Sequence, residues 1–156
     1  MTIDARDLAF GDIVSYHKTI LFFEGIRMRK NYGRCAIYNG DYAVEACLQD
    51  ISIKAVYLTE QSLAANGFTT GTDEKGFYAW HSDAPQIFLR KSKDFDRAFD
   101  VDIRENWRHY ERIEGEGYIY FWHSLQALLR MMGKGELARS FITFDGYEFP
   151  EVAADE

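Results

Sequence analysis

Histidine is the first side chain to consider for proton transfer near neutral pH, and the chain contains four. They are His17, His81, His109 and His123, and they show no metal-ligand spacing such as His-x-x-x-His. His123 is the most suggestive, because it lies beside Trp122 where an amphipathic helix is expected to begin. It is either a site residue at a helix N-terminus or a structural histidine bonded to a backbone carbonyl. No nucleophile or acid pairs with it by sequence, which favours the structural interpretation.

A run of acidic residues between positions 94 and 105 has the hard carboxylate oxygens that bind Mg²⁺ or Ca²⁺. The run consists of Asp94, Asp96, Asp100, Asp102 and Glu105. It lacks the order of an EF-hand, and the nearby lysines, Lys91 and Lys93, precede it. A solvated strand face explains the alternation of charge more simply, so no metal site is predicted.

Basic side chains gather in two places, each with an aromatic neighbour. The first cluster is Arg27, Arg29, Lys30 and Arg34 around Tyr32, and the second is Arg90, Lys91 and Lys93 after Phe88. Such a combination can hold phosphates and stack a base, which makes the first cluster a candidate nucleic-acid site. Against this, the isoelectric point near 5.1 is far from the basic character of a dedicated nucleic-acid binder.

The motifs of the common cofactor and catalytic sites do not occur. The sequence has no phosphate loop, no Gly-x-Ser-x-Gly elbow, no His-Glu-x-x-His and no Cys-x-x-Cys. No cofactor and no catalytic residue is therefore predicted. An enzyme is not excluded, but a non-enzymatic protein is favoured.

The net charge of −7 is unevenly spread. Residues 1–93 carry eleven acidic and eleven basic side chains, whereas residues 94–156 carry fourteen acidic and seven basic ones. An acidic half repels nucleic-acid phosphates and suits a basic partner surface, although it can also simply aid solubility.

At 156 residues the chain has the length of one domain, and its hydrophobic content of 47% argues against disorder. We expect a single domain over residues 1–156, with possible sub-parts at 8–58 and 59–150. No apolar run approaches a membrane span, and the first residues lack the order of a signal peptide, so a cytoplasmic protein is expected.

A two-residue turn at Asn39-Gly40 would place Cys35 opposite Val44 rather than Cys47. Reduced, unbridged cysteines are therefore predicted.

The first sixty residues have the pattern of short strands joined by tight turns, one of them at His17-Lys18. Strands are expected over residues 11–16, 20–26, 34–38, 42–48 and 51–56. Five such strands predict an SH3-like barrel or a bent antiparallel sheet. A short helix should follow, with Thr59 as its N-cap and Asn66-Gly67 as its stop.

The remainder predicts a second antiparallel sheet closed by a helix, which makes the fold class α+β. Strands are expected over residues 77–81, 86–91, 99–104 and 107–113, with a terminal hairpin over 141–149. The best helix runs from Ile119 or Phe121 to Met132, and residues 136–140 can add one more turn. Its predicted apolar stripe is Phe121, Leu125, Leu128, Leu129 and Met132, with Ser124, Gln126 and Arg130 lying away from it.

Three stretches, taken in order, resemble a family of small uncharacterised proteins common in Bacteroides-type gut bacteria and their phages and mobile elements. They are the Leu-x-x-Gly-Asp-x-Val of residues 8–14, the Leu-Thr-Glu-x-x-Leu-x-x-x-Gly-Phe of 58–68, and the His-x-Leu-Gln-x-Leu of 123–128 with its Glu-Leu end at 136–137. Order and spacing agree from residue 8 to 137. Tyr57 stands where the family usually has proline, and Lys134 stands at a usual glycine position. The resemblance implies where such a protein occurs, in a gut bacterium or its phages and mobile elements, but it implies no mechanism.

These observations favour a non-enzymatic accessory or protein-interaction module of a mobile element or its host. It would present a sheet face or its acidic half to a protein partner whose identity the sequence does not give. One alternative is a nucleic-acid-associated module that uses the 27–34 loop. Another is a hydrolase or nuclease centred on Asp100 and Asp102 with His109 or His123.

Overall fold

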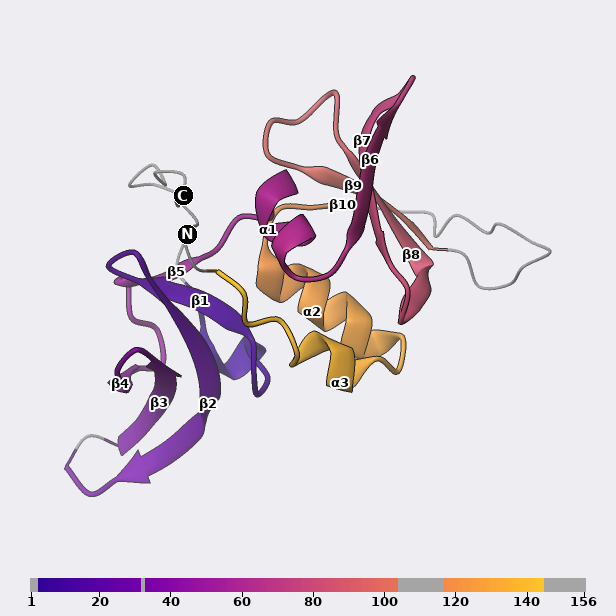
Figure 1. The fold of residues 1–156 in the computed structure, drawn as a ribbon. Coiled ribbons are helices and arrows are strands. Elements are labelled where there is room, and N and C mark those ends of the chain that lie inside the picture. Colours follow the sequence, from indigo (N-terminus) through magenta and orange to yellow (C-terminus); the bar gives the residue numbers. More distant parts are fainter. Residues whose placement is uncertain (1–2, 32, 104–116, 145–156) are drawn as a thin grey trace. The chain divides into compact units, whose positions relative to one another are not determined.

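The computed structural model describes residues 3–31, 33–103 and 117–144, and its fold is α+β as predicted. Two antiparallel sheets of five strands each accompany a few short helices (Figure 1). The chain packs as two compact units. The first contains residues 1–56 and 121–140, and the second contains residues 57–120 and 141–147. None of the described helices is long and apolar enough to cross a membrane.

The sheet of the first unit follows a 3-10 turn, η1 (Ala5–Asp7), and has the strand order β4-β3-β2-β1-β5. Its strands are β1 (Ile13–Tyr16), β2 (Thr19–Arg29), β3 (Gly33–Gly40), β4 (Val44–Cys47) and β5 (Ile53–Ala55). The sheet is antiparallel, as expected, and it is open, with β4 and β5 as its edges. Its core includes Val14, Leu21 and Ile53, none of which is exposed.

The two hairpin turns predicted in this sheet have different outcomes. His17 and Lys18 both have a positive φ and join β1 to β2 in a two-residue turn, as expected. The predicted turn at Asn39-Gly40 is wrong. Both residues continue β3 and pair with β2, and a longer connection follows, so that Tyr38 opposes Val44. The register of β3 and β4 therefore differs from the predicted one.

Gly40 serves the close approach of two strands rather than a turn. A Cβ atom at this position would lie 2.2 Å from the carbonyl oxygen of Ile20. Only glycine fits such a contact without movement of the backbone. A glycine needed for close approach gives the same sequence signal as a turn glycine, and this explains the misplaced turn.

Two helices complete the first unit, α2 (Trp122–Met131) and α3 (Gly135–Ala138). Gly133, with a φ of +75°, separates them and ends α2, as its position predicts. The buried side chains of α2 are Trp122, Leu125, Gln126 and Leu129. The expectation that Gln126 lies away from the buried face is wrong, because its exposure is 0%. The helix is turned so that Trp122 and Gln126 share the buried face.

The second unit contains a short helix and a second five-stranded sheet. The helix α1 (Glu60–Ala65) begins with the predicted cap, since the Thr59 side chain accepts a hydrogen bond from the Ser62 N–H. The strands of the second sheet are β6 (Thr69–Asp73), β7 (Gly76–His81), β8 (Ala84–Lys91), β9 (Phe99–Ile103) and β10 (Tyr118–Ile119). Their order in the sheet is β10-β9-β8-β7-β6. The strand β6, with the polar sequence Thr-Thr-Gly-Thr-Asp, lacks the apolar alternation from which strands are predicted, and it was not expected.

The structure does not confirm two of the predicted elements in the last third of the chain, the terminal hairpin and the strand over 107–113. Residues 141–144 form no strand, although Phe141 and Phe144 are buried, so the first half of the expected terminal hairpin is wrong. Phe141 instead packs on Phe68, their ring centres 5.6 Å apart. The second half of that hairpin and the strand expected over 107–113 lie outside the described residues.

Candidate functional site

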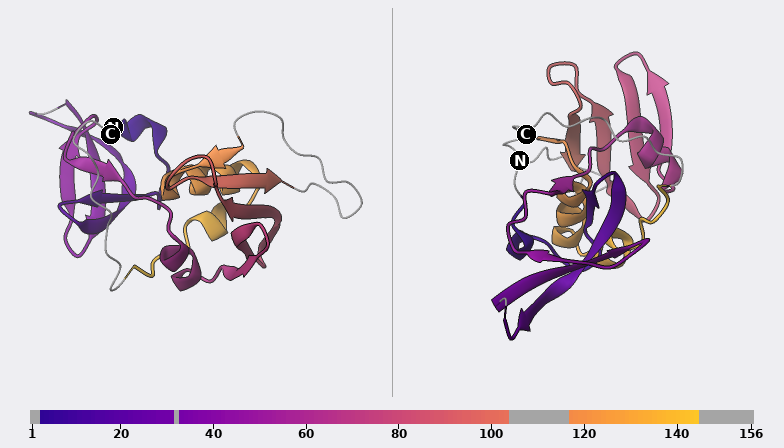
Figure 2. Two further views of the ribbon diagram at one scale, coloured as in Figure 1. Left: turned by 90° about the horizontal axis from the view of Figure 1, so that it is seen from above. Right: turned by 90° about the vertical axis from the view of Figure 1, so that its left-hand side faces the viewer.

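The first candidate site is the free end of the β2–β3 hairpin, which projects beyond the rest of its sheet (Figure 2). The pairing of β1 with β2 ends at Phe22, and the pairing of β4 with β3 ends at Cys35. Beyond those points β2 and β3 pair only with each other, through Met28 with Arg34 and Arg29 with Gly33. We call residues 27–34 the arm. It is a two-stranded β-ribbon.

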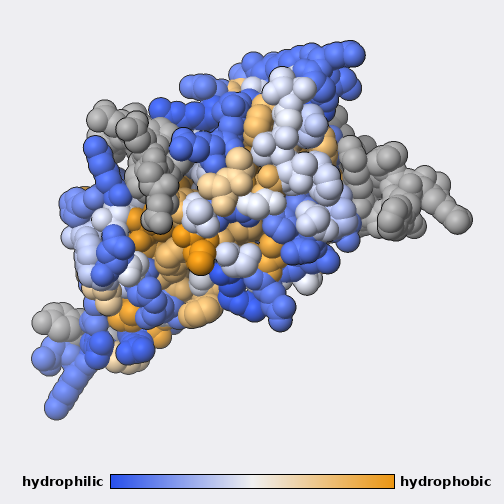
Figure 3. Space-filling model, viewed as in Figure 1, coloured by the Kyte–Doolittle hydropathy of each residue, from blue (hydrophilic) through white to orange (hydrophobic). Residues whose placement is uncertain are grey.

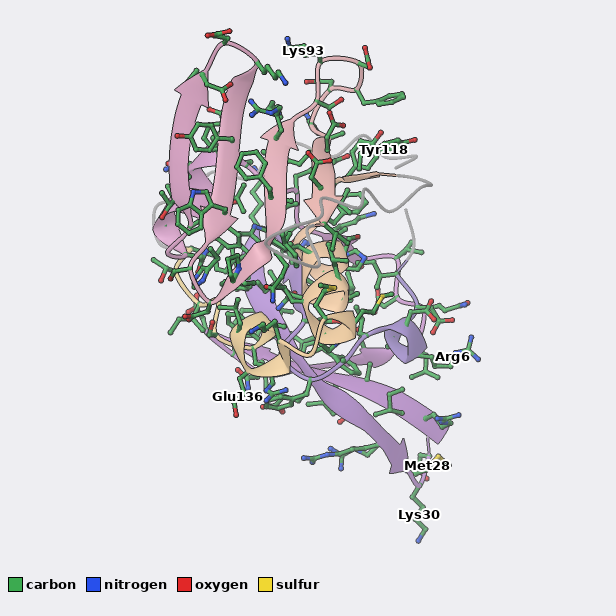
Figure 4. The ribbon with its side chains drawn as sticks, turned by 90° about the vertical axis from the view of Figure 1, so that its right-hand side faces the viewer. Arg6, Met28, Lys30, Lys93, Tyr118 and Glu136 are labelled. Carbon is green, nitrogen blue, oxygen red and sulfur yellow. The ribbon has the colours of Figure 1, made fainter. Side chains whose placement is uncertain are left out.

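The arm carries the basic residues that the sequence analysis selected. Arg27, Arg29, Lys30 and Arg34 are all exposed, while Tyr32 lies outside the described residues. Figure 4 shows Met28 and Lys30 at the outer end of the hairpin, and this end is hydrophilic in Figure 3. Arg29 forms an ion pair of 2.8 Å with Glu45. Among the described residues, the other three cations have no ion pair.

The second predicted site residue, His123, lies in the first turn of α2. Its ring stacks on Phe121 at 5.6 Å between ring centres. Burial lowers the pKa of His123 below its usual value, an effect that Asp12 opposes and Arg130 reinforces. Within the described part of the chain, the buried Nδ1 atom has no hydrogen-bond partner, so the expected carbonyl partner is not found at this nitrogen. Among the residues that the structure describes, no acid that orients the ring and no nucleophile is hydrogen-bonded to His123.

A buried polar network next to His123 has a structural purpose. The Gln126 side chain accepts a hydrogen bond from the Ile13 N–H at 2.9 Å and donates to the Gly11 and Ala138 carbonyls at 2.9 and 2.8 Å. Asp12, which is 1% exposed, forms an ion pair with Arg130. These contacts fix β1, α2 and α3 together.

The second sheet has a half-exposed face that the sequence analysis did not single out as a site. Ala79, Leu89 and Phe99 are fully buried, so their neighbours along β7, β8 and β9 point to the opposite face. We call this opposite face the aromatic face. It contains Tyr78, Trp80, Phe88, Arg90, Asp100 and Asp102, all half-buried.

Cross-strand contacts order the aromatic face. Tyr78 and Phe88 stack with their planes 18° apart and their centres separated by 5.6 Å. The guanidinium of Arg90 lies 5.5 Å from the centre of Phe88 and 5.9 Å from that of Tyr78. Arg90 also makes a bidentate contact with Asp73 and lowers the pKa of that carboxyl to about 2. The two rings therefore already bind a cation, the Arg90 guanidinium, which is also paired with the Asp73 carboxylate.

Two residues of the acidic run, Asp100 and Asp102, lie on one face of a strand, as the sequence predicts. Asp100 and Asp102 alternate on β9 with Phe99 and Ile103, which are buried. The described residues include no group of three His, Cys, Asp or Glu side chains that could bind a metal ion. His109 and Glu105, which the hydrolase hypothesis and the acidic run include, lie outside the described residues.

The aromatic face gives only a weak signal in the sequence. Tyr78 and Trp80 alternate around Ala79, and Phe88 and Arg90 alternate around Leu89. Each strand has aromatic residues on the face opposite its buried one, and apolar residues on both faces are equally typical of a strand buried on both sides. Only the register, which opposes Tyr78 to Arg90 and Trp80 to Phe88, shows that the rings share one face.

Comparison with known proteins adds no relationship. The chain matches no protein-family model, no curated protein and no solved structure. The likeness to the Bacteroides-type family therefore stays a prediction.

Proposed function

We propose that this chain is a protein-interaction module that binds a basic protein segment on the aromatic face. The observation that supports this best is the gathering of Tyr78, Trp80 and Arg90 on one half-exposed sheet face. Tryptophan, tyrosine and arginine are the residue types that most often dominate the energy of protein–protein interfaces. An accessory role belongs to the same proposal, in the setting that the family resemblance implies, a mobile element or its host.

The charge of the second unit favours a basic partner. Residues 57–120 and 141–147 carry thirteen acidic and eight basic side chains, a net charge of −5. On the aromatic face, Asp100 and Asp102 lie on the strand next to Phe88 and Arg90. Partner lysine or arginine side chains would stack on the half-exposed rings, as Arg90 does, and pair with the Asp100 carboxylate.

The test is the binding of a labelled peptide that alternates arginine with serine, followed by fluorescence anisotropy. We expect the wild-type chain to bind it, and Trp80→Ala to raise the Kd about thirtyfold, the effect of losing a hot spot of ~2 kcal/mol. Asp100→Asn should weaken binding by a smaller factor that shrinks as salt is added.

Asp83→Asn is the matched control, because Asp83 is exposed in the turn between β7 and β8 and lies outside the aromatic face. It should bind the peptide as tightly as the wild-type chain does. Equal affinity for a glutamate–serine peptide, or a wild-type Kd in Trp80→Ala, would contradict the proposal.

A second candidate function, nucleic-acid binding, is favoured by the geometry of the arm. A two-stranded β-ribbon fits the major groove of duplex DNA, and exposed arginines and lysines neutralise its phosphates. Three of the four basic side chains of the arm have no ion pair among the described residues, so they are available to an anionic partner.

Titration of a duplex DNA oligonucleotide at several salt concentrations tests the arm. If the arm binds phosphates, the double variant Arg27→Glu/Arg34→Glu should weaken binding. It should also reduce the slope of log K against log salt by about 0.9 for each phosphate that the arm no longer neutralises. Lys18→Glu, in the turn between β1 and β2, should leave the slope unchanged. Equal slopes for the wild-type chain and the double variant would exclude the arm.

A further inference from the structure

The two cysteines of the chain are cross-strand neighbours. Cys35 in β3 and Cys47 in β4 are paired directly opposite each other, and both are free thiols. The sequence did not predict this pairing, because the turn expected at Asn39-Gly40 places Cys35 opposite Val44. The longer connection between the strands brings the two cysteines into register.

The spacing of antiparallel strands brings such a pair within reach of a disulfide. Directly opposed residues have Cα atoms about 4.5 or 5.5 Å apart, depending on the type of pair. Both distances lie inside the range of about 4.4–6.8 Å seen in disulfides. Because directly opposed residues of paired strands point to the same face, both cysteine side chains lie on one side of the sheet, and joining them requires no change of fold.

The two thiols differ in access and in surroundings. Cys47 is exposed, whereas Cys35 is 6% exposed. Burial raises the pKa of the Cys35 thiol, and the neighbouring Glu45 carboxylate raises it further. Cys47 is therefore the thiol that a soluble oxidant meets first, and Cys35 is positioned as the resolving thiol.

We propose that Cys35 and Cys47 form a reversible disulfide in exchange with low-molecular-weight disulfides such as oxidised glutathione. The Cys47 thiolate attacks one sulfur of the oxidant, which forms a mixed disulfide and releases one glutathione thiolate. Cys35 then attacks the Cys47 sulfur and releases the second glutathione, and its proton passes to that leaving thiolate. Two protein thiols are oxidised to one disulfide, and one oxidised glutathione is reduced to two thiols.

Two features make this bond a switch rather than a permanent link. The Cβ atoms of opposed residues lie about 4.5–5.5 Å apart, wider than the mean of about 3.8 Å in disulfides, so closing the bond strains the strands and makes it easier to reduce. Arg27 pairs with Cys35 on the other side of β3, so the disulfide would join β3 to the edge strand β4 where the arm begins.

Thiol counting in glutathione buffers tests the proposal on the whole chain. The reduced wild-type chain should take up two alkyl groups under denaturing conditions. After treatment with oxidised glutathione it should take up none, run as a monomer, and carry no glutathione mass. Dithiothreitol should restore both thiols without unfolding, as followed by circular dichroism.

Single variants separate the two roles. Cys35→Ala should accumulate glutathione on Cys47, because the resolving thiol is missing, and Cys47→Ser should lose most of its reaction with oxidised glutathione. The proposal is overturned if the wild-type chain retains glutathione on Cys47 or forms a Cys47-linked dimer in place of the internal bond. Retention of two alkylatable thiols after oxidation would overturn it equally.

Discussion

Gln126→Leu is expected to lower the free energy of unfolding by about 3–5 kcal/mol, because one buried N–H and two buried carbonyls lose their partner at ~1–3 kcal/mol each. The Gln126 side chain is fully buried and bonds to Ile13, Gly11 and Ala138. Leucine has a similar volume, so the loss reports the hydrogen bonds rather than a cavity. Urea denaturation followed by circular dichroism measures the change in stability.

Met131→Ala is the control for this variant. Met131 is in the same helix but is 82% exposed, so its truncation should change stability by less than about 0.5 kcal/mol. Gln126→Glu keeps the acceptor for Ile13 and loses both donors, so it should also destabilise the protein near neutral pH. If Gln126→Leu were as stable as Met131→Ala, the hydrogen bonds of Gln126 would have no net value for the fold.

Trp122→Ala is expected to cost a further large amount, about 3–5 kcal/mol, since it removes a fully buried indole and leaves a cavity that the surrounding side chains fill only in part. Trp122 has an exposure of 0%, and its backbone N–H donates to the Val56 carbonyl at 2.9 Å. That backbone bond survives the substitution, so the measured loss comes from the side chain.

Leu128→Ala provides the comparison that tests the orientation of α2. Leu128 belongs to the apolar stripe predicted from sequence, yet it is only partly buried. Its truncation should cost less than half as much as that of Trp122, measured by the same urea denaturation. The reverse order would mean that α2 packs through the predicted stripe.

The existence of α2 follows from its apolar spacing, but its orientation does not. Leu125 and Leu129 belong both to the predicted stripe and to the buried face. Trp122 and Gln126 complete the buried face, and Gln126 is the residue that hydrophobic patterning is bound to misplace. A glutamine is buried only where backbone groups from elsewhere meet it, and the pattern of one helix does not contain that information.

The candidate surfaces were unequally predictable for a related reason. The basic arm is contiguous in sequence, so the sequence alone predicts which residues form it. The aromatic face is assembled from separate strands, and the cysteine pair depends on a turn whose length a local Asn-Gly signal misstates. Charge clusters are local properties, whereas registers are tertiary properties that a strand pattern leaves open.

The first unit is discontinuous along the chain, and this has a consequence for its synthesis. Its sheet ends at residue 55 and its helices begin at residue 122, with most of the second unit between them. At about 5–20 residues per second, a ribosome needs roughly 3–13 s to add the intervening residues, during which Ile13 and Gly11 lack Gln126. During that interval the N-terminal strands have no α2 to pack against, so we expect chaperones to protect them mainly then.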